Sequence, residues 1–160
     1  MLRENDEDVH EHSIIQVVHG KLYGVKSTLN VWNPKVEKQN EFSLSQVWLV
    51  GGDRMNTLEA GWGDKVTGNW WLRLQGVDMG YWPKALFPYL LEGATYVDFG
   101  GEIYYRRVGS HTRTQMGSGH FAEEVEDANK CYDLKVGRKT DGLWGQFFFL
   151  GGPGGSDQCT

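Results

Sequence analysis

The sequence predicts an all-β protein, an antiparallel β-sandwich with one short helix. Glycine supplies 22 of the 160 residues, and tryptophan, tyrosine and phenylalanine supply seven each. Aromatic side chains favour strands, whereas glycine is typical of the turns and bulges that interrupt strands. Short apolar stretches separated by turn residues follow one another along the chain. This pattern is typical of two packed antiparallel sheets.

The strands are expected where apolar residues alternate with polar ones, or where an apolar run ends at glycine or proline. The clearest case is residues 42–50, in which Phe42, Gln46 and Trp48 share one face. Gln46 is the polar member of this otherwise apolar row. The other expected strands are residues 14–18, 22–32, 56–62, 69–75, 94–105, 131–136 and 143–150.

Residues 83–91 are the one segment with the character of a helix. Pro83 can occupy the first helical turn, but Pro88 removes an internal hydrogen bond, so we expect this helix to be short or kinked. Residues 1–12 are polar and are expected to form a flexible N-terminal segment. The remaining residues, 13–160, are expected to form a single domain.

Charge and composition exclude several classes of function. The net charge of −5 disfavours nucleic acid, whose phosphates require a basic surface. No apolar run reaches the 18 residues of a membrane span, so we expect no membrane partner. The acidic start lacks the apolar stretch of a secretory signal, and we expect no signal peptide in this chain.

The cysteine pattern leaves two alternatives. Cys131 and Cys159 are the only cysteines, and they suit either one disulfide that closes the C-terminal segment or two free buried thiols. Because there is no C-x-x-C motif, the sequence gives no support for zinc, and we predict no metal and no cofactor. His10 and His12 are of a metal-ligating type, but they are near the terminus and a third ligand is not in sight.

Two glutamates in strand-like segments are the candidate catalytic residues. Glu59 and Glu102 are surrounded by small residues, including Gly61, Gly100 and Gly101. Glycine in a strand allows another backbone to approach closely. If the two segments are neighbours, the carboxylates face one cleft and share a proton, so that one acid and one base activate water together. The alternative is that both are edge-strand residues that oppose aggregation.

Several motifs carry a family resemblance. The most specific are NTLEAGW at 56–62, FGGE at 99–102 and the run at 114–121. Further matching stretches lie at 12–14, 23–32, 41–48, 70–72, 80–83, 111–112, 131–133 and 151–154, and at Cys159. By these motifs the chain resembles the neprosin family of plant proteins, a group of glutamic peptidases.

The resemblance implies an antiparallel β-sandwich endopeptidase that cleaves preferentially after proline at acidic pH. It places the family's two catalytic glutamates on Glu59 and Glu102, without deciding which is the acid and which the base. It also implies a Cys131–Cys159 disulfide, proline-containing peptides or proteins as substrates, and secretion. Relative to the family the chain is shortened at residues 63–69 and 122–130.

Four further residues are candidates for substrate binding. Gln46 donates a hydrogen bond to a tetrahedral oxyanion if its face lines the cleft, or else satisfies a neighbouring backbone group. Tyr81, Trp82 and Tyr104 form an apolar wall for a substrate proline, with core packing as the alternative. Trp70 and Trp71 adjoin each other, so in a strand they point to opposite faces.

The sequence thus favours a glutamic endopeptidase. The main rival is a catalytically inactive β-sandwich that binds peptide or glycan through its aromatic side chains. A glycosidase is a third hypothesis, because paired carboxylates also cleave glycosidic bonds.

Overall fold

The computed structural model describes residues 7–52, 56–121, 131–138 and 146–155. These residues contain no helix of seven or more residues, and strands dominate them, which confirms the all-β class. The strands are β1 (Glu7–Leu22), β2 (Phe42–Gly51), β3 (Asn56–Leu58), β4 (Trp62–Gly63), β5 (Trp70–Leu74), β6 (Val77–Trp82), β7 (Ala94–Arg107), β8 (Met116–Gly117), β9 (Asp133–Arg138) and β10 (Gln146–Gly152).

The strands form three sheets, with orders β1-β7-β2-β3, β8-β10-β9 and β4-β5-β6. The pairs β2–β3, β4–β5, β5–β6, β8–β10 and β9–β10 are antiparallel. The chain divides into two compact units. Unit 1 comprises Met1–Ile14, Asn30–Ser45 and Gly100–Thr160, and unit 2 comprises Ile15–Leu29 and Gln46–Phe99.

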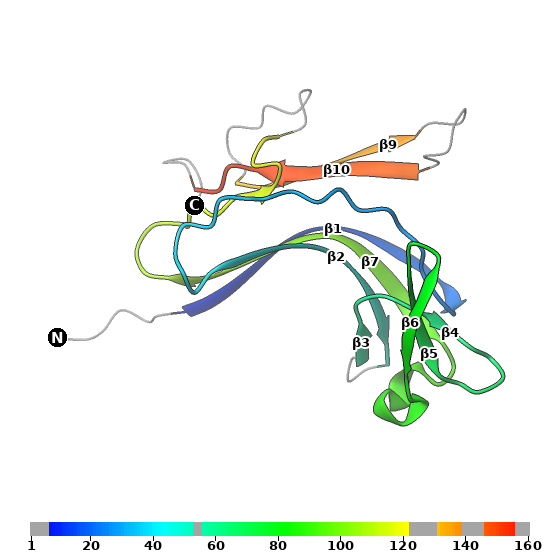
Figure 1. Cartoon of the computed structure of the whole chain (residues 1–160). Coiled ribbons are helices and arrows are strands. Elements are labelled where there is room, and N and C mark those ends of the chain that lie inside the picture. The colour runs from blue at the N-terminus through cyan, green and yellow to red at the C-terminus, as the bar shows by residue number, and fades with distance from the viewer. Residues whose placement is uncertain (1–6, 53–55, 122–130, 139–145, 156–160) are drawn as a thin grey trace. The chain divides into compact units, whose positions relative to one another are not determined.

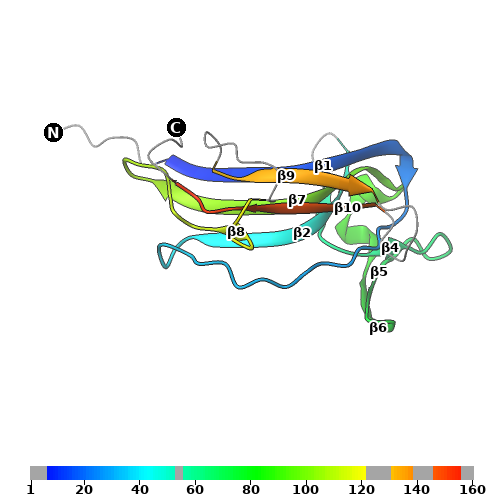
Figure 2. The same ribbon diagram turned by 90° about the horizontal axis from the view of Figure 1, so that it is seen from above.

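Unit 1 has a two-layer core. Ile103 and Tyr105 of β7 are buried together with Met116 of β8, and Val9 of β1 and Leu150 of β10 pack against them. The sheet β8-β10-β9 therefore packs as a second layer on β1 and β7 (Figures 1 and 2). This is the sandwich packing that the alternating strands predicted.

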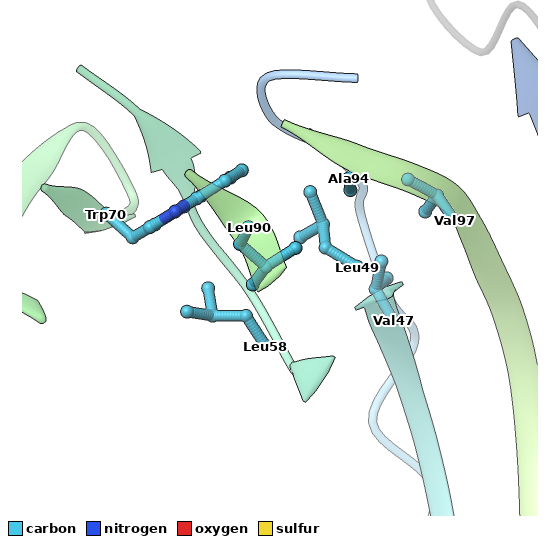
Figure 3. Packing of buried hydrophobic residues seen from close by; sticks show 7 residues of the cluster. All are labelled: Val47, Leu49, Leu58, Trp70, Leu90, Ala94 and Val97. Atoms are coloured by element: carbon cyan, nitrogen blue, oxygen red, sulfur yellow. The ribbon is translucent and has the colours of Figure 1, made fainter. Parts of the chain in front are cut away.

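Unit 2 has a separate core around Leu90. In the view of Figure 3, Leu90 lies between the Trp70 ring and Leu49. Residues from β2, β3, β5 and β7 surround it because each strand presents alternate apolar side chains to one side. The buried members are Val47, Leu49, Leu58, Trp70, Leu90, Ala94 and Val97.

The expected helix at 83–91 is present as two 3₁₀ turns, η1 (Lys84–Leu86) and η2 (Pro88–Leu90). Phe87 N–H donates to the Lys84 carbonyl at 3.0 Å, the short-range bond of a 3₁₀ turn. Pro88 has no N–H with which to continue an α-helix, and its ring would collide with the carbonyl four residues earlier. This is the physical reason that one helix becomes two turns.

Three expectations about strands need correction. The expected strand at 56–62 ends at Leu58, and the next two residues form a bend, so Glu59 does not lie in a strand. β1 begins at Glu7, so residues 7–12 are strand rather than a flexible extension. Beyond Leu22, the expected strand at 22–32 contains only an isolated bridge between Gly24 and Trp62. Val31 in that segment is 97% exposed. Apolar and polar side chains do alternate in this segment, but a strand also needs a neighbouring strand to which its backbone can hydrogen-bond.

The segment at 63–69, which is expected to be shortened relative to the family, connects β4 to β5. Asp64 closes the turn, since its carboxylate accepts hydrogen bonds from Val66 N–H at 2.9 Å and from the Thr67 hydroxyl at 2.6 Å. Gly68, with φ of +77°, donates its N–H to the Asp64 carbonyl at 2.7 Å. These hydrogen bonds make the loop compact, and its shortening relative to the family stays a prediction. The other shortening, at 122–130, lies outside the described residues.

Candidate active site

Glu102 lies on β7 beside the N-terminal part of β1. His10 Nδ1 is 2.5 Å from Glu102 Oε1, and His12 Nε2 is 3.6 Å from the same oxygen. The Glu102 side chain is only 12% exposed, and β7 lies between β1 and β2 in its sheet. Glu102 is therefore not an edge-strand residue, and that alternative is wrong for this glutamate.

Gly100 allows β1 to approach β7 closely. A Cβ atom at Gly100 would collide with the Ser13 carbonyl oxygen and lie 2.8 Å from Ile14 Cα. This confirms the prediction that a missing side chain at Gly100 admits another backbone. At Gly101 the space is filled instead by a side chain, because a Cβ there would lie 2.8 Å from Met116 Sδ.

Aromatic rings lie next to the contact between His10 and Glu102. The rings of Tyr104 and Phe42 stack with centroids 5.1 Å apart, and the His10 ring lies 4.9 Å from Tyr104. The Tyr104 hydroxyl donates to Asp8 Oδ1 at 3.0 Å, and this hydrogen bond raises the pKa of Tyr104. The structure thus brings Tyr104 into the surroundings of Glu102. Contact between Tyr104 and a substrate proline stays a prediction.

Glu59 lies in the bend directly after β3, the last strand in its sheet, and it is exposed. The backbone at Gly61, two residues after Glu59, lies close to the backbone of β5. Gly61 has φ of +144°, and a Cβ there would lie 2.9 Å from the Trp71 carbonyl oxygen. A close backbone approach at Gly61 was predicted, and it is confirmed.

Gln46 lies half-buried on β2 next to the buried Val47. Because successive side chains of a strand alternate, Gln46 points away from the unit 2 core that Val47 enters. Trp82 on β6 packs against that core, as the core-packing alternative predicts. Tyr81 points to the other face of the sheet and is 53% exposed.

Three rings form an aromatic row across the β4-β5-β6 sheet, consisting of Trp62, Trp71 and Tyr81. Trp71 is the cross-strand partner of both other residues. The ring centroids of Trp62 and Trp71 are 6.3 Å apart, and those of Trp71 and Tyr81 are 5.0 Å apart. Trp70, by contrast, is 2% exposed in the core, which confirms that Trp70 and Trp71 point to opposite faces.

The candidate residues are divided between the two units. Glu102 and Tyr104 belong to unit 1, whereas Glu59, Gln46, Tyr81 and Trp82 belong to unit 2. The pairing of Glu59 with Glu102 stays a prediction.

An ion pair between the half-buried Glu11, on the opposite face of β1, and the buried side chain of His111 was not identified from the sequence. Glu11 Oε1 accepts hydrogen bonds from His111 Nε2 at 2.7 Å and from the Tyr105 hydroxyl at 2.8 Å. His111 Nδ1 lies 2.7 Å from the Thr112 carbonyl oxygen. When Glu11 is ionised, both ring nitrogens of His111 face acceptors, and only the doubly protonated ring can donate to both.

The pKa directions agree with this geometry. Burial opposes the charge of His111, but the hydrogen bonds to Glu11 and Thr112 outweigh it and raise the pKa of His111. Burial likewise opposes the charge of Glu11, but the hydrogen bonds from His111 and Tyr105 lower the pKa of Glu11. The folded protein thus favours the ionised pair.

We expect Glu11→Gln to lower the free energy of unfolding by about 1–3 kcal/mol near pH 5.5. The raised pKa of His111 gives stability that is complete below its unfolded value of about 6.5 and is lost as the pH rises through the folded value. The lowered pKa of Glu11 gives stability above about pH 4.3 that is lost as the pH falls. Urea denaturation of the wild type and the variant at pH 5.5 and pH 9 measures the difference. An equal difference at both values would contradict the charged pair.

A second buried carboxylate, Glu41, lies immediately before β2. Its side chain is 0% exposed, and its Oε2 atom accepts hydrogen bonds from the hydroxyls of Thr112, at 2.6 Å, and Thr114. Lys38 Nζ lies 3.8 Å from Oε1. Glu37 contacts the same stretch of chain, because its carboxylate accepts a hydrogen bond from the Arg113 N–H at 2.8 Å. This hydrogen bond lowers the pKa of Glu37. These contacts fix residues 37–41 against 112–114.

The remaining predictions concern the disulfide, a metal site and a membrane-spanning segment. Within the described part no cysteine is free, but Cys159 lies outside it, so the Cys131–Cys159 disulfide stays a prediction. In the same part no group of three or more His, Cys, Asp or Glu residues is placed to hold a metal ion. The described helical turns include none of the length and apolar character needed to cross a membrane.

Residues 62–128 match the family model described as Neprosin. The resemblance to the neprosin family is confirmed. This family is related to peptidases. Glu102, Tyr81, Trp82 and Tyr104 lie inside the matched neprosin segment, and Glu59 lies three residues before it.

Proposed function

We propose that this neprosin-family chain is a glutamic endopeptidase that hydrolyses peptide bonds, preferentially after proline, at acidic pH. The observation that carries the proposal is the carboxylate of Glu102. It is largely buried on a central strand, inside the segment that matches the family, and is held by His10. A buried carboxylate that is fixed by a neighbouring donor is suited to orient a water molecule or to exchange a proton with it.

In the proposed reaction, Glu59 and Glu102 act as the acid and the base. The base takes a proton from water as the water attacks the scissile carbonyl, and the acid protonates the amide nitrogen that leaves. Gln46 donates a hydrogen bond to the oxyanion of the tetrahedral intermediate. Tyr104 and Tyr81 contact the substrate proline. Like the Cys131–Cys159 disulfide, secretion of the protein is part of this proposal.

The test is hydrolysis of two fluorogenic peptides that differ only in one residue, proline or alanine, between pH 3 and pH 7. We expect cleavage of the proline peptide on the acidic side, with the new C-terminus at proline as identified by mass spectrometry. Faster cleavage of the alanine peptide would contradict the specificity. No cleavage of either peptide by folded protein at any pH would contradict the enzyme.

The aromatic row supports the second candidate function, a binding domain without catalysis. Trp62 and Tyr81 are 39% and 53% exposed, and stacked aromatic rings on an open sheet face bind peptides or glycans through apolar contact. Binding of the uncleaved proline peptide, with loss of binding in Trp71→Ala, would favour this function if no hydrolysis is found.

A further inference from the structure

The surroundings of Glu102 contain one donor that the proposed reaction does not yet use. His10 and His12 lie two residues apart on β1, so both side chains point to the same face of the strand. Both rings approach the same atom, Oε1 of Glu102, from Nδ1 of His10 at 2.5 Å and from Nε2 of His12 at 3.6 Å. Only the His10 distance is within hydrogen-bond range.

His10 is itself held in place from two sides. Its ring lies 4.9 Å from the Tyr104 ring and 6.2 Å, edge to face, from Phe42. Ser13 and Ile14, which follow His10 on β1, contact Gly100 closely, so this part of β1 lies tightly against β7. His10 is 49% exposed at its side chain, so solvent reaches this face beside the buried carboxylate.

This contact determines which oxygen of Glu102 is available for chemistry. A glutamate side chain turns about three bonds, and a base must hold its reactive oxygen within a fraction of an ångström of the productive position. With Oε1 engaged by His10, the Glu102 carboxylate can turn little.

We propose that His10 is the positioning residue of Glu102. Its Nδ1–H group holds Oε1 and thereby presents Oε2 to the reacting atoms. The inference rests on the proposed peptidase function. In this role His10 contacts neither the substrate nor the attacking water, and it acts only through the Glu102 carboxylate.

Three variants test the role of His10. His10→Leu removes the donor, whereas His10→Asn retains an NH₂ group at the distance of Nδ1 from the backbone. His12→Leu is the matched control, because its ring is on the same strand face but beyond hydrogen-bond range of Oε1. Each variant is compared with the wild type by kcat and KM on the proline peptide, and its folding is checked by urea denaturation.

We expect His10→Leu to lower kcat about 10- to 100-fold, with KM nearly unchanged, because misplacement of a catalytic group acts on the reaction step. His10→Asn should recover most of kcat, and His12→Leu should stay near the wild type. Unchanged kcat in folded His10→Leu, or equal losses in both leucine variants, would overturn the positioning role and leave the peptidase standing. A wild type that is folded and inactive on every peptide would overturn both proposals.

Discussion

Glu102→Gln is expected to lower kcat/KM for a proline peptide roughly 10²–10⁴-fold, the usual contribution of one acid or base. Glutamine has nearly the shape of glutamate and can still accept a hydrogen bond from His10, so the geometry of β1 and β7 is retained. What is lost is the ability to exchange a proton. The measurement is the initial rate of hydrolysis across pH 3–7, beside the wild type.

Two further variants make this result specific. Glu59→Gln should cause a loss of similar size, because both members of an acid–base pair are needed. Glu92→Gln is the control, since the Glu92 side chain is 82% exposed and forms a surface ion pair with Lys21; this variant should leave the rate unchanged. Activity retained in Glu102→Gln would exclude the glutamate mechanism.

Gly100→Ala is expected to destabilise the protein by about 1–3 kcal/mol and to lower its activity. In a strand, alanine in place of glycine is ordinarily favourable by about 0.5–1 kcal/mol. Here the added methyl group would meet backbone atoms of Ser13 and Ile14, which cannot turn aside as a side chain can. β1 must move away from β7, and His10 moves with it. Urea denaturation and kcat together measure both effects.

Gly63→Ala provides the matched control. The nearest atoms to a Cβ at Gly63 lie at 3.5 Å, an ordinary contact, and its φ is not in the left-handed region. We expect this variant to be as stable as the wild type. If the two alanine variants had equal stability, the close approach of β1 to Gly100 would be disproved.

Much of the fold was predictable because it depends on local pattern. Alternation in residues 42–50 located β2, and the glycine and aromatic content predicted the all-β class. The two prolines at 83 and 88 explained why residues 83–91 do not form a continuous helix. The segment at 22–32 shows the limit of this reasoning, since its alternation is as clear as that of a strand but no neighbouring strand pairs with it over most of its length.

The surroundings of the candidate site were less predictable. Glu102 stood out because a carboxylate next to two glycines is unusual in a strand. Its hydrogen-bonding partner His10 is 92 residues away in the sequence, and the sequence contains five histidines that could serve. His111 and Glu11 are 100 residues apart. Nothing local to either residue signals the other.

The sequence by itself determined the all-β class, the resemblance to the neprosin family and the two candidate glutamates, because composition, alternation and motif are properties of short stretches of chain. The tertiary structure decided that residues 7–12 are strand and that His10 faces Glu102 while Glu11 faces His111. The reason is that a strand presents alternate side chains to opposite faces, and only the pairing of β1 with β7 determines which residues each face of β1 contacts.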